Sequence, residues 1–267
     1  MAQDIPKVVS GLDDIVPGSL MAIESLYKTA FNRVVPVSSC EVAEMTKLYE
    51  NCQRMINIAY ANEMADACIP LGIDPFEVSL AVIDFSNISL TSYQVCRAAA
   101  TKPFGYSNFT PSAGVGGHCI PVNPYYLLST SDFPILNHAT QTMAMRPSMI
   151  VSRMMRRVYI EFGMQPAKYH TLVVGVGFKP GQAVLSHSPG ISMMTALKAK
   201  WKAEVAFMDP LVKEVPGFRK LQAEEWHSAS LEEFHLIIVV INQPGVDTKV
   251  LQSLRVPIVH YCYERAA

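Results

Sequence analysis

The 267-residue sequence lacks a charge excess and lacks any long hydrophobic run. Its 22 Lys and Arg residues nearly balance its 23 Asp and Glu residues, so the net charge is −1 at pH 7. A chain this close to neutral offers no basic surface to nucleic acid or anionic membranes. No stretch of about 18 apolar residues indicates a membrane-spanning helix, and the first residues lack the basic and apolar regions of a signal peptide. These absences predict a cytoplasmic protein that binds neither nucleic acid nor membrane.

Cysteine pairs of the kind that bind zinc are also missing. The spacing of the six cysteines supports no zinc site, and free thiols are expected in a cytoplasmic chain rather than disulfides. We therefore predict no bound metal. Half of the residues are apolar and 17% are charged, which is typical of a folded protein with one or two domains. None of the cysteines forms a CxxC pair with another: Cys40, Cys52, Cys68, Cys96, Cys119 and Cys262.

The first part of the chain has the periodicity of helices. From residue 40 onwards, apolar residues recur every three or four positions, which predicts one long helix that Pro70 and Gly72 end. The arginines near residue 155 are interpreted as the solvated side of another helix: Arg153, Arg156 and Arg157. Further helices are expected at 18–31, at 72–83 and at 138–163, the last one broken or preceded by Pro147.

After about residue 165 the pattern changes to strands that alternate with helices. This alternation predicts a small parallel sheet with helices on its faces, and hence an α plus α/β fold class. The predicted divisions of the chain are a lead-in at 1–35, a helical domain at 36–165 and a sheet domain at 166–267. Hydrophobic, β-branched runs mark the expected strands, within 170–177, 203–210, 235–244 and 256–261.

The segment AGVGGHCIPVNPYYLL, residues 113–128, is the first candidate for chemistry. Gly116 and Gly117 let the backbone approach a ligand closely. Cys119 follows this turn, and His118 beside it could activate the thiol as a nucleophile. The alternative is a buried free cysteine in a tight turn, and the residues alone leave both interpretations open.

Lys47 and Asn51 form a second candidate pair. They lie one helical turn apart and therefore share a face of the predicted long helix. The apolar side of that helix lies nearby, so the pair could flank a cleft. Taken without other information, a solvated helix surface is the better interpretation.

The segment GVGFKP ends the first expected strand of the sheet domain. Gly175 and Gly177 would allow a ligand near the carboxyl end of the strand, where Lys179 could meet a phosphate. The segment lacks the third glycine and the directly following helix of a dinucleotide fingerprint. Asp209 is interpreted as a turn residue rather than a ribose ligand.

Three segments together resemble the UDP-glucose/GDP-mannose dehydrogenase family, and within it the UDP-N-acetyl-hexosamine 6-dehydrogenase-like branch. The resemblance runs from about residue 5 to residue 245, and the three motifs agree in order and spacing. The GGHCIP loop is the most specific of them. The segments are AEMTKLYENCQRMINIAYANEMA, TKPFGYSNFTPSAGVGGHCIPVNPYYL and VVGVGFKP followed by SHSP.

The resemblance implies a fold and a reaction. Members of the family have an NAD-binding domain, a helical domain that dimerises through a long helix, and a Rossmann-like C-terminal domain; they oxidise a primary alcohol twice through a cysteine thioester. By this resemblance the chain is expected to form a homodimer through the helix at 42–66 and to bind a small-molecule substrate. The catalytic candidates are Cys119, Lys47, Asn51, Asn123 and His118. The substrate-binding candidates are Phe109, Gly116, Gly117, Tyr125, Phe178 and Lys179.

Several positions depart from the family's pattern. The family's NAD-binding domain is not recognised in the sequence, and no G-x-G-x-x-G occurs. Asn123 stands where the family has an aspartate, and an amide cannot accept a proton as a carboxylate can. Ser186 replaces an arginine that would touch the cofactor, while Ala183 and Val184 replace two acids. These changes predict that NAD binding is lost and that no cofactor is used.

Three functions remain open. The first is a repurposed, cofactor-independent isomerase, lyase or cyclase that acts on a hydrophobic small molecule, in a setting such as secondary-metabolite biosynthesis. The second is the catalytic half of a UDP-sugar 6-dehydrogenase that works with a separate NAD-binding chain. The third is a non-catalytic partner subunit of an active dehydrogenase.

Overall fold

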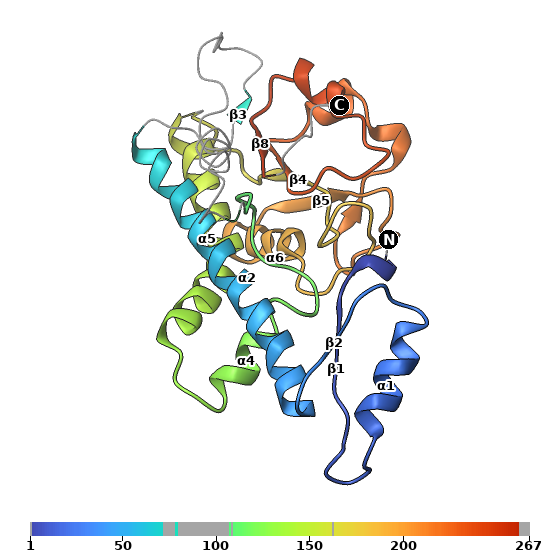
Figure 1. Ribbon diagram of the computed structural model, residues 1–267. Coiled ribbons are helices and arrows are strands. Elements are labelled where there is room, and N and C mark those ends of the chain that lie inside the picture. Colours follow the sequence, from blue (N-terminus) through green and yellow to red (C-terminus); the bar gives the residue numbers. More distant parts are fainter. Residues whose placement is uncertain (1, 72–77, 80–106, 108, 162, 262–267) are drawn as a thin grey trace. The chain divides into compact units, whose positions relative to one another are not determined.

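A computed structural model describes residues 2–71, 78–79, 107, 109–161 and 163–261 (Figure 1). The chain divides into two compact units, residues 1–54 and 55–267. Helix α2 (Cys40–Cys68) contributes residues to both units. The domain boundaries expected near residues 35 and 165 remain predictions.

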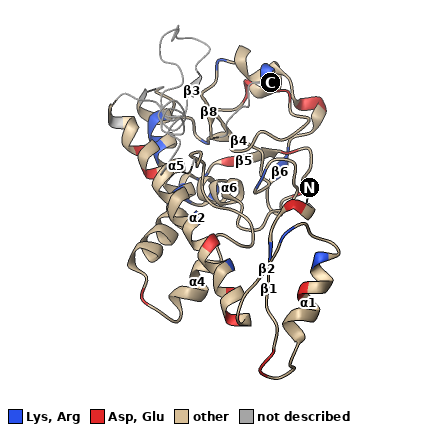
Figure 2. Ribbon diagram, viewed as in Figure 1, with Lys and Arg blue, Asp and Glu red and all other residues tan. Residues whose placement is uncertain are grey.

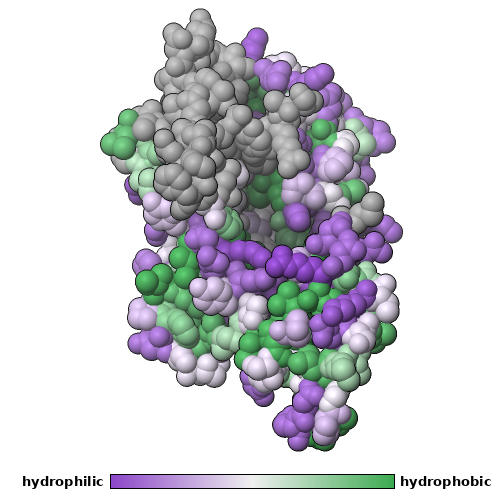
Figure 3. Space-filling view, viewed as in Figure 1, coloured by the Kyte–Doolittle hydropathy of each residue, from purple (hydrophilic) through white to green (hydrophobic). Residues whose placement is uncertain are grey.

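The first unit is a small β-α-β element followed by the start of α2. Strand β1 (Lys7–Val9) pairs in parallel with β2 (Val34–Pro36), and α1 (Ser19–Lys28) lies between them in the chain, after the short 3-10 helix η1 (Ala2–Asp4). No residue of α1 is buried. Hydrophobic residues consequently remain on the surface of this unit (Figure 3), among them Ile5, Leu12, Ile15, Val16, Met21 and Leu26.

The second unit is built on a six-stranded sheet of order β3-β8-β7-β4-β5-β6. Five neighbouring strands are parallel, and β3 pairs antiparallel with β8 at one edge. The predicted class, α plus α/β with a parallel sheet, is therefore confirmed. The strands are β3 (Val78–Ser79), β4 (His170–Val174), β5 (Glu204–Met208), β6 (Arg219–Lys220), β7 (Leu236–Val239) and β8 (Ile258–His260).

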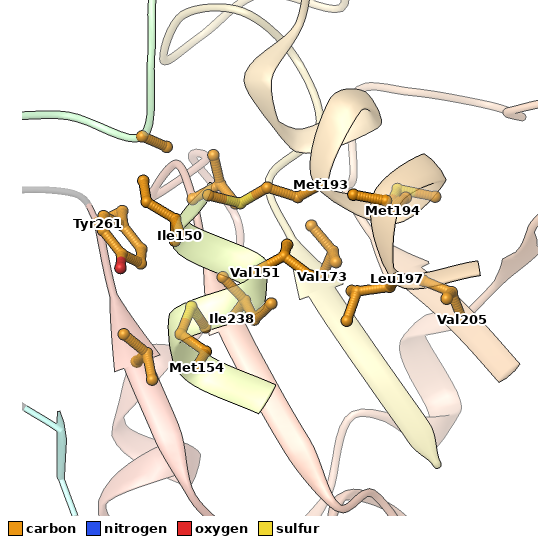
Figure 4. Close-up of a cluster of buried hydrophobic side chains, with 14 of the residues drawn as sticks. Ile150, Val151, Met154, Val173, Met193, Met194, Leu197, Val205, Ile238 and Tyr261 are labelled. Carbon is orange, nitrogen blue, oxygen red and sulfur yellow. The ribbon is translucent and has the colours of Figure 1, made fainter. Parts of the chain in front are cut away.

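The sheet carries a hydrophobic core on each face, because successive strand residues point to opposite sides. On β4, Val173 belongs to one core while Leu172 and Val174 belong to the other. Each large side chain buried in this way stabilises the fold by about 1.5–3 kcal/mol. Figure 4 shows the first core, in which α5 and α6 contribute Ile150, Val151, Met154, Met193, Met194 and Leu197.

The helices of the second unit differ in three places from those expected. The helix expected at 138–163 begins earlier, at Pro134, and continues through Pro147 instead of breaking there. Buried residues on both sides of the proline offset the lost backbone hydrogen bond, including Met143 and Ile150. The helix expected at 72–83 lies mostly outside the described residues, and its two described residues form β3.

The remaining elements are short, and the one that matters for the site was not expected. It is the helix that directly follows the glycine-rich loop, residues 123–128. No helix in the described ranges is long and apolar enough to cross a membrane. The helical elements of this unit after α2 are η2 (Ile69–Leu71), α4 (Asn123–Leu128), α5 (Pro134–Glu161), α6 (Pro189–Trp201), η3 (Ala223–Glu225), α7 (Ser228–Leu231) and η4 (Thr248–Ser253).

Candidate functional site

Two segments of the second unit meet at the candidate site: the glycine-rich loop at 113–119 and the connection from β4 to α6. The backbone N–H of Gly117 donates to the carbonyl oxygen of Ser186 at 2.8 Å. The Nδ1 atom of His187 lies 3.0 Å from the carbonyl oxygen of Gly117. These two contacts join chain segments about 70 residues apart.

The glycines of the loop are explained by a neighbouring ring. A Cβ atom on Gly117 would lie 2.9 Å from Cε2 of Phe178, and Gly117 has a φ of +93°. A Cβ atom on Gly116 would lie 2.8 Å from Cβ of Phe178. Three of the predicted substrate-binding residues are therefore brought together, and they contact one another.

Cys119 lies in the turn that leads into α4. Its carbonyl oxygen accepts hydrogen bonds from the N–H groups of Val122 at 3.1 Å and Asn123 at 2.8 Å. The Cys119 thiol is half-buried and forms no disulfide, while His118 beside it is exposed. The geometry thus holds Asn123 at the first position of α4, one turn after the thiol.

A cavity of about 440 Å³ lies beside this turn. Its described lining contains the predicted Tyr125 but neither Cys119 nor Asn123. No Lys, Arg, Asp or Glu is among these lining residues, and Figure 2 shows that α4 carries no charged residue. The lining residues are Met55, Val115, Pro121, Val122, Tyr125, Thr140, Met143, Ala144, Pro147, His187, Pro189 and Ser192.

The remaining predicted site residues named here are not among the described lining residues. Lys47 belongs to the first unit, where its exposed Nζ pairs with Glu50 at 3.3 Å. Asn51, also in the first unit, is buried and accepts a hydrogen bond from Arg54 at 2.9 Å. Lys179 is exposed, and Phe109 is half-buried. A joint site of Lys47 and Asn51 with Cys119 remains a prediction.

An ion-pair cluster that the sequence did not indicate holds the start of the loop. Arg146 is 4% exposed and donates to Asp66 at 2.7 Å and 3.4 Å. The Nε atom of Arg146 donates to the carbonyl oxygen of Ser112 at 2.9 Å, and the N–H of Ser112 donates to Asn62 at 2.8 Å. Helices α2 and α5 therefore fix the residue from which the glycine-rich loop departs.

Electrostatics within this cluster favour the charged carboxylate. Burial by itself would raise the pKa of Asp66, but hydrogen bonds and positive charge from Arg153 and Arg146 lower it overall. Arg153 donates to Asp66 at 3.1 Å, which raises the pKa of Arg153. The interpretation of Arg153 as a purely solvated residue is therefore wrong, because its partner lies on another helix, 87 positions away in the sequence.

The end of β4 is closed by protein groups. A Cβ on Gly175 would lie 2.0 Å from the carbonyl oxygen of Ile241, and one on Gly177 would lie 2.4 Å from that of Gln182. The fully buried Asp209 accepts hydrogen bonds from the N–H groups of Val176, Gly177, Leu211 and Val212 and from Nε2 of Gln243. Asp209 is thus engaged within the fold, in agreement with its interpretation as a turn residue.

No group of three or more His, Cys, Asp or Glu residues in the described part of the chain could hold a metal ion. The cavity offers a ligand apolar side chains to pack against and a few polar atoms to bind. His187 was not singled out from the sequence, although it stands inside the segment SHSP that departs from the family's pattern. The departure of this segment from the family's pattern was the signal in the sequence that could have pointed to His187.

Comparison with known proteins shows which family the glycine-rich loop and the segments around it match. Residues 41–91 and 85–145 match the UDP-glucose/GDP-mannose dehydrogenase family, central domain. The chain is 29% identical over 192 residues to a UDP-N-acetyl-D-mannosamine dehydrogenase of Pyrococcus horikoshii, covering 71% of this chain and 41% of that protein. It is 27% identical over 213 residues to a UDP-N-acetyl-D-glucosamine 6-dehydrogenase of Salmonella typhi, covering 76% and 45%.

Solved structures agree on the fold. The structure of a UDP-D-ManNAc dehydrogenase from Pyrococcus horikoshii matches with a TM-score of 0.73 at 23% identity, over 95% of this chain and 55% of that one. The chain spans about half the length of the relatives that it matches. The chain therefore carries the central domain of the UDP-glucose/GDP-mannose dehydrogenase family and is homologous to UDP-N-acetyl-hexosamine dehydrogenases.

Proposed function

We propose that this chain acts as a cofactor-independent enzyme of the isomerase, lyase or cyclase type on an apolar small molecule held in the 440 Å³ cavity. The lining of that cavity is the observation that supports the proposal. Eight of its twelve described lining residues are apolar, and none is Lys or Arg. A sugar nucleotide carries a charged diphosphate, which proteins usually meet with Arg, Lys or helix N-termini. An apolar ligand suits this lining better.

The proposed reactions need few functional groups. Isomerisation, elimination and cyclisation can be accelerated by orientation of the substrate and by a small number of fixed hydrogen bonds. The lining supplies polar atoms from Tyr125, Thr140, His187 and Ser192. The rest of the surface holds the substrate by packing.

NAD, which the family implies, does not fit the described residues at the end of β4. The positions that a Cβ atom would take on Gly175 and Gly177 are filled by the carbonyl oxygens of Ile241 and Gln182, so these glycines are needed for packing within the fold. Ser186 is exposed and stands where the resemblance places a cofactor-binding arginine. We therefore derive no step through NAD.

A second candidate is supported by the residues that match the family. Cys119, Lys47, Asn51 and Lys179 stand at positions where the resemblance expects catalytic and substrate-binding residues. They favour the catalytic half of a UDP-sugar dehydrogenase that works with a separate NAD-binding chain. Asn123 in place of the aspartate weighs against that candidate.

Saturation-transfer NMR with two probes separates the candidates. 2-Naphthol represents an apolar ligand, and UDP-N-acetylglucosamine represents a sugar nucleotide. The variant Ala144→Phe places a ring at the cavity wall, whereas Ala199→Phe makes the same change at an exposed position of α6 outside the cavity lining. We expect 2-naphthol to receive saturation from the wild type and from Ala199→Phe, and to lose it with Ala144→Phe.

Two results would overturn the first candidate. One is an unchanged 2-naphthol signal in Ala144→Phe, because the ligand would then bind elsewhere. The other is saturation of UDP-N-acetylglucosamine together with NADH formation above the level of a full-length relative alone, when this chain is added to that relative and NAD. That second result would establish the dehydrogenase half instead.

We also propose that the protein forms a homodimer through α2. One face of this helix remains exposed and apolar along most of its length, although another face is buried in the fold. A repeated apolar face of this kind suits a helix shared between two copies. The exposed face consists of Val42, Met45, Tyr49, Tyr60 and Met64.

Light scattering after gel filtration tests the homodimer. Tyr49 and Tyr60 are 70% and 59% exposed, so lysine at either position leaves the fold of one copy unaffected. We expect Tyr49→Lys with Tyr60→Lys to elute as a monomer, while Glu44→Lys, on the opposite face, remains a dimer. A wild-type monomer at micromolar concentration would refute the homodimer.

We place the protein in the cytoplasm. The four described cysteines are Cys40, Cys52, Cys68 and Cys119, and all of them are free thiols. Unpaired thiols are typical of a reducing compartment. Alkylation of intact cells followed by peptide mass spectrometry would show free thiols if this is correct, and disulfides otherwise.

A further inference from the structure

His187 has an unusual backbone for a residue with a side chain. Its φ is +50°, and within the described part of the chain only Lys202 is another non-glycine residue with a positive φ. This left-handed region is unfavourable for residues with a Cβ atom. Ser188, the next residue, caps α6 by accepting from the N–H of Ile191 at 3.2 Å and is fixed by donating to Val176 at 2.6 Å. The fold therefore holds His187 at a defined place, directly before α6.

The contact of His187 with the glycine-rich loop fixes which ring nitrogen carries the proton. Nδ1 lies 3.0 Å from the carbonyl oxygen of Gly117. A carbonyl oxygen has no hydrogen to donate, so Nδ1 is the donor of this bond. In the neutral ring, Nε2 then carries the lone pair. Among the described residues, no group forms a hydrogen bond with Nε2 of His187.

Two further polar groups of the cavity, the hydroxyls of Thr140 and Ser192, also offer lone pairs. The hydroxyl of Thr140 donates to the carbonyl oxygen of Leu136 at 2.7 Å, and the hydroxyl of Ser192 donates to that of Ser188 at 3.1 Å. Both hydroxyl hydrogens are therefore used within helices α5 and α6. A ligand in this cavity therefore meets acceptors at Thr140, Ser192 and His187, while the hydroxyl of Tyr125 can either donate or accept.

We propose that Nε2 of His187 accepts a hydrogen bond from the ligand and thereby selects apolar molecules that carry a hydroxyl group. This inference rests on the proposed function, because it concerns the ligand of the same cavity. His187 acts as the specificity-determining residue, and its Nδ1 bond to Gly117 is the feature that presents Nε2 in the accepting form. The selected class is an apolar molecule with a hydroxyl donor.

Two substitutions separate the two nitrogens of the ring. The amide of asparagine can replace Nδ1, and asparagine tolerates a positive φ, so His187→Asn retains the bond to Gly117 but removes Nε2. The longer glutamine places its amide near the position of Nε2, so His187→Gln retains an acceptor but gives up the bond to Gly117. Both variants keep a polar residue at an exposed position.

The binding experiment uses 2-naphthol and 2-methylnaphthalene, which differ in shape by little more than the exchange of a hydroxyl for a methyl group. The methyl compound is the more hydrophobic, so a preference for 2-naphthol reports the polar contact. We expect wild-type protein to bind 2-naphthol about tenfold more tightly, and His187→Asn to lose this preference. His187→Gln should retain part of it. In wild-type protein labelled with ¹⁵N-histidine, Nδ1 of His187 should show the chemical shift of a protonated nitrogen and Nε2 that of a bare one.

Each contrary outcome has a distinct meaning. If neither compound binds the wild type, the proposed function and this inference both fail. If both compounds bind the wild type equally, the cavity stands as a binding site and this inference alone is overturned. Loss of the preference in His187→Gln together with its retention in His187→Asn would show that the bond to Gly117, and not Nε2, sets the preference. A bare Nδ1 in the NMR spectrum would likewise overturn the inference.

Discussion

Arg146→Met tests whether the ion-pair cluster stabilises the second unit. Methionine keeps much of the side-chain length but removes the charge and the three hydrogen bonds that Arg146 donates, two to Asp66 and one to the carbonyl oxygen of Ser112. Arg146 is 4% exposed, so water cannot replace these partners easily. The perturbation therefore leaves polar groups without their partners inside the fold.

The magnitude follows from how far the pair is buried. Breaking a fully buried pair costs about 3–5 kcal/mol. Asp66 is 26% exposed and keeps its bond from Arg153, which reduces the loss. We therefore expect a loss of about 2–4 kcal/mol in the free energy of unfolding and a fall in Tm of roughly 5–12 °C.

Urea unfolding followed by tryptophan fluorescence measures this loss. Both tryptophans of the chain, Trp201 and Trp226, lie in the second unit and report its unfolding. The matched control is Arg156→Met on the same helix, where the exposed arginine should contribute less than about 0.5 kcal/mol. A double-mutant cycle with Asp66→Asn should give a coupling energy above about 1 kcal/mol.

The same pair predicts a pH dependence. The folded state lowers the pKa of Asp66, so the unfolded chain binds a proton there more readily than the folded chain does. The stabilisation is therefore fully present above the unfolded pKa of about 3.9 and is lost as the pH falls through the lower, folded pKa. The stability difference between wild type and Asp66→Asn should shrink below pH ~4. Equal unfolding midpoints for Arg146→Met and Arg156→Met at pH 7, or a negligible coupling energy, would refute the reasoning.

Two further predictions concern the end of β4. Gly175→Ala and Gly181→Ala start from almost the same φ, +77° and +76°, but an added Cβ meets the carbonyl oxygen of Ile241 at 2.0 Å in the first and nothing within 4 Å in the second. Gly181→Ala should cost only about 1–2 kcal/mol in urea unfolding, whereas Gly175→Ala should fail to give a folded second unit; equal losses would contradict this. Asp209→Asn should lower the free energy of unfolding by about 3 kcal/mol or more, because an amide NH₂ would face backbone donors that now bind a carboxylate. Thermal unfolding measures this change, and a Tm within about 1 °C of the wild type would contradict it.

The sequence was sufficient to predict the elements whose cause is local. The buried residues Leu172, Val173 and Val174 of β4 lie in a hydrophobic, β-branched run that the sequence shows. Four of the five parallel strands followed from the alternation of strands with helices. Short strands such as β1 and β6 were missed because runs of two or three residues show no periodicity.

The missed parts of the site depend on contacts between distant residues. The pairing of Asp66 with Arg146 joins positions 80 residues apart, and no spacing rule connects them. The glycines at 175 and 177 looked suited to a ligand, but their space is taken by carbonyl oxygens from residues 241 and 182. A glycine in a sequence reports that something approaches closely, and only the fold shows whether that is a ligand or another part of the chain.

The same distinction applies to the positions that match the family's motifs and to those that depart from them. Several residues that match the family's motifs pack against each other: Gly116 and Gly117 against Phe178, and Gly116 also against Pro189. The fold alone accounts for these matches, whatever chemistry the site performs.

The positions that depart from the family's pattern lie where contacts with the core place few limits on the type of residue. Ala183, Val184 and Ser186 are exposed, and Asn123 is only half-buried. Residues at such positions can change without destabilising the core, and they are also the ones available to a ligand. Compared with the pattern that the family resemblance implies, the departures replace two acids, an arginine and an aspartate by uncharged residues. None of these four positions belongs to the described cavity lining, which itself contains no charged residue, and that lining agrees with the apolar ligand proposed above.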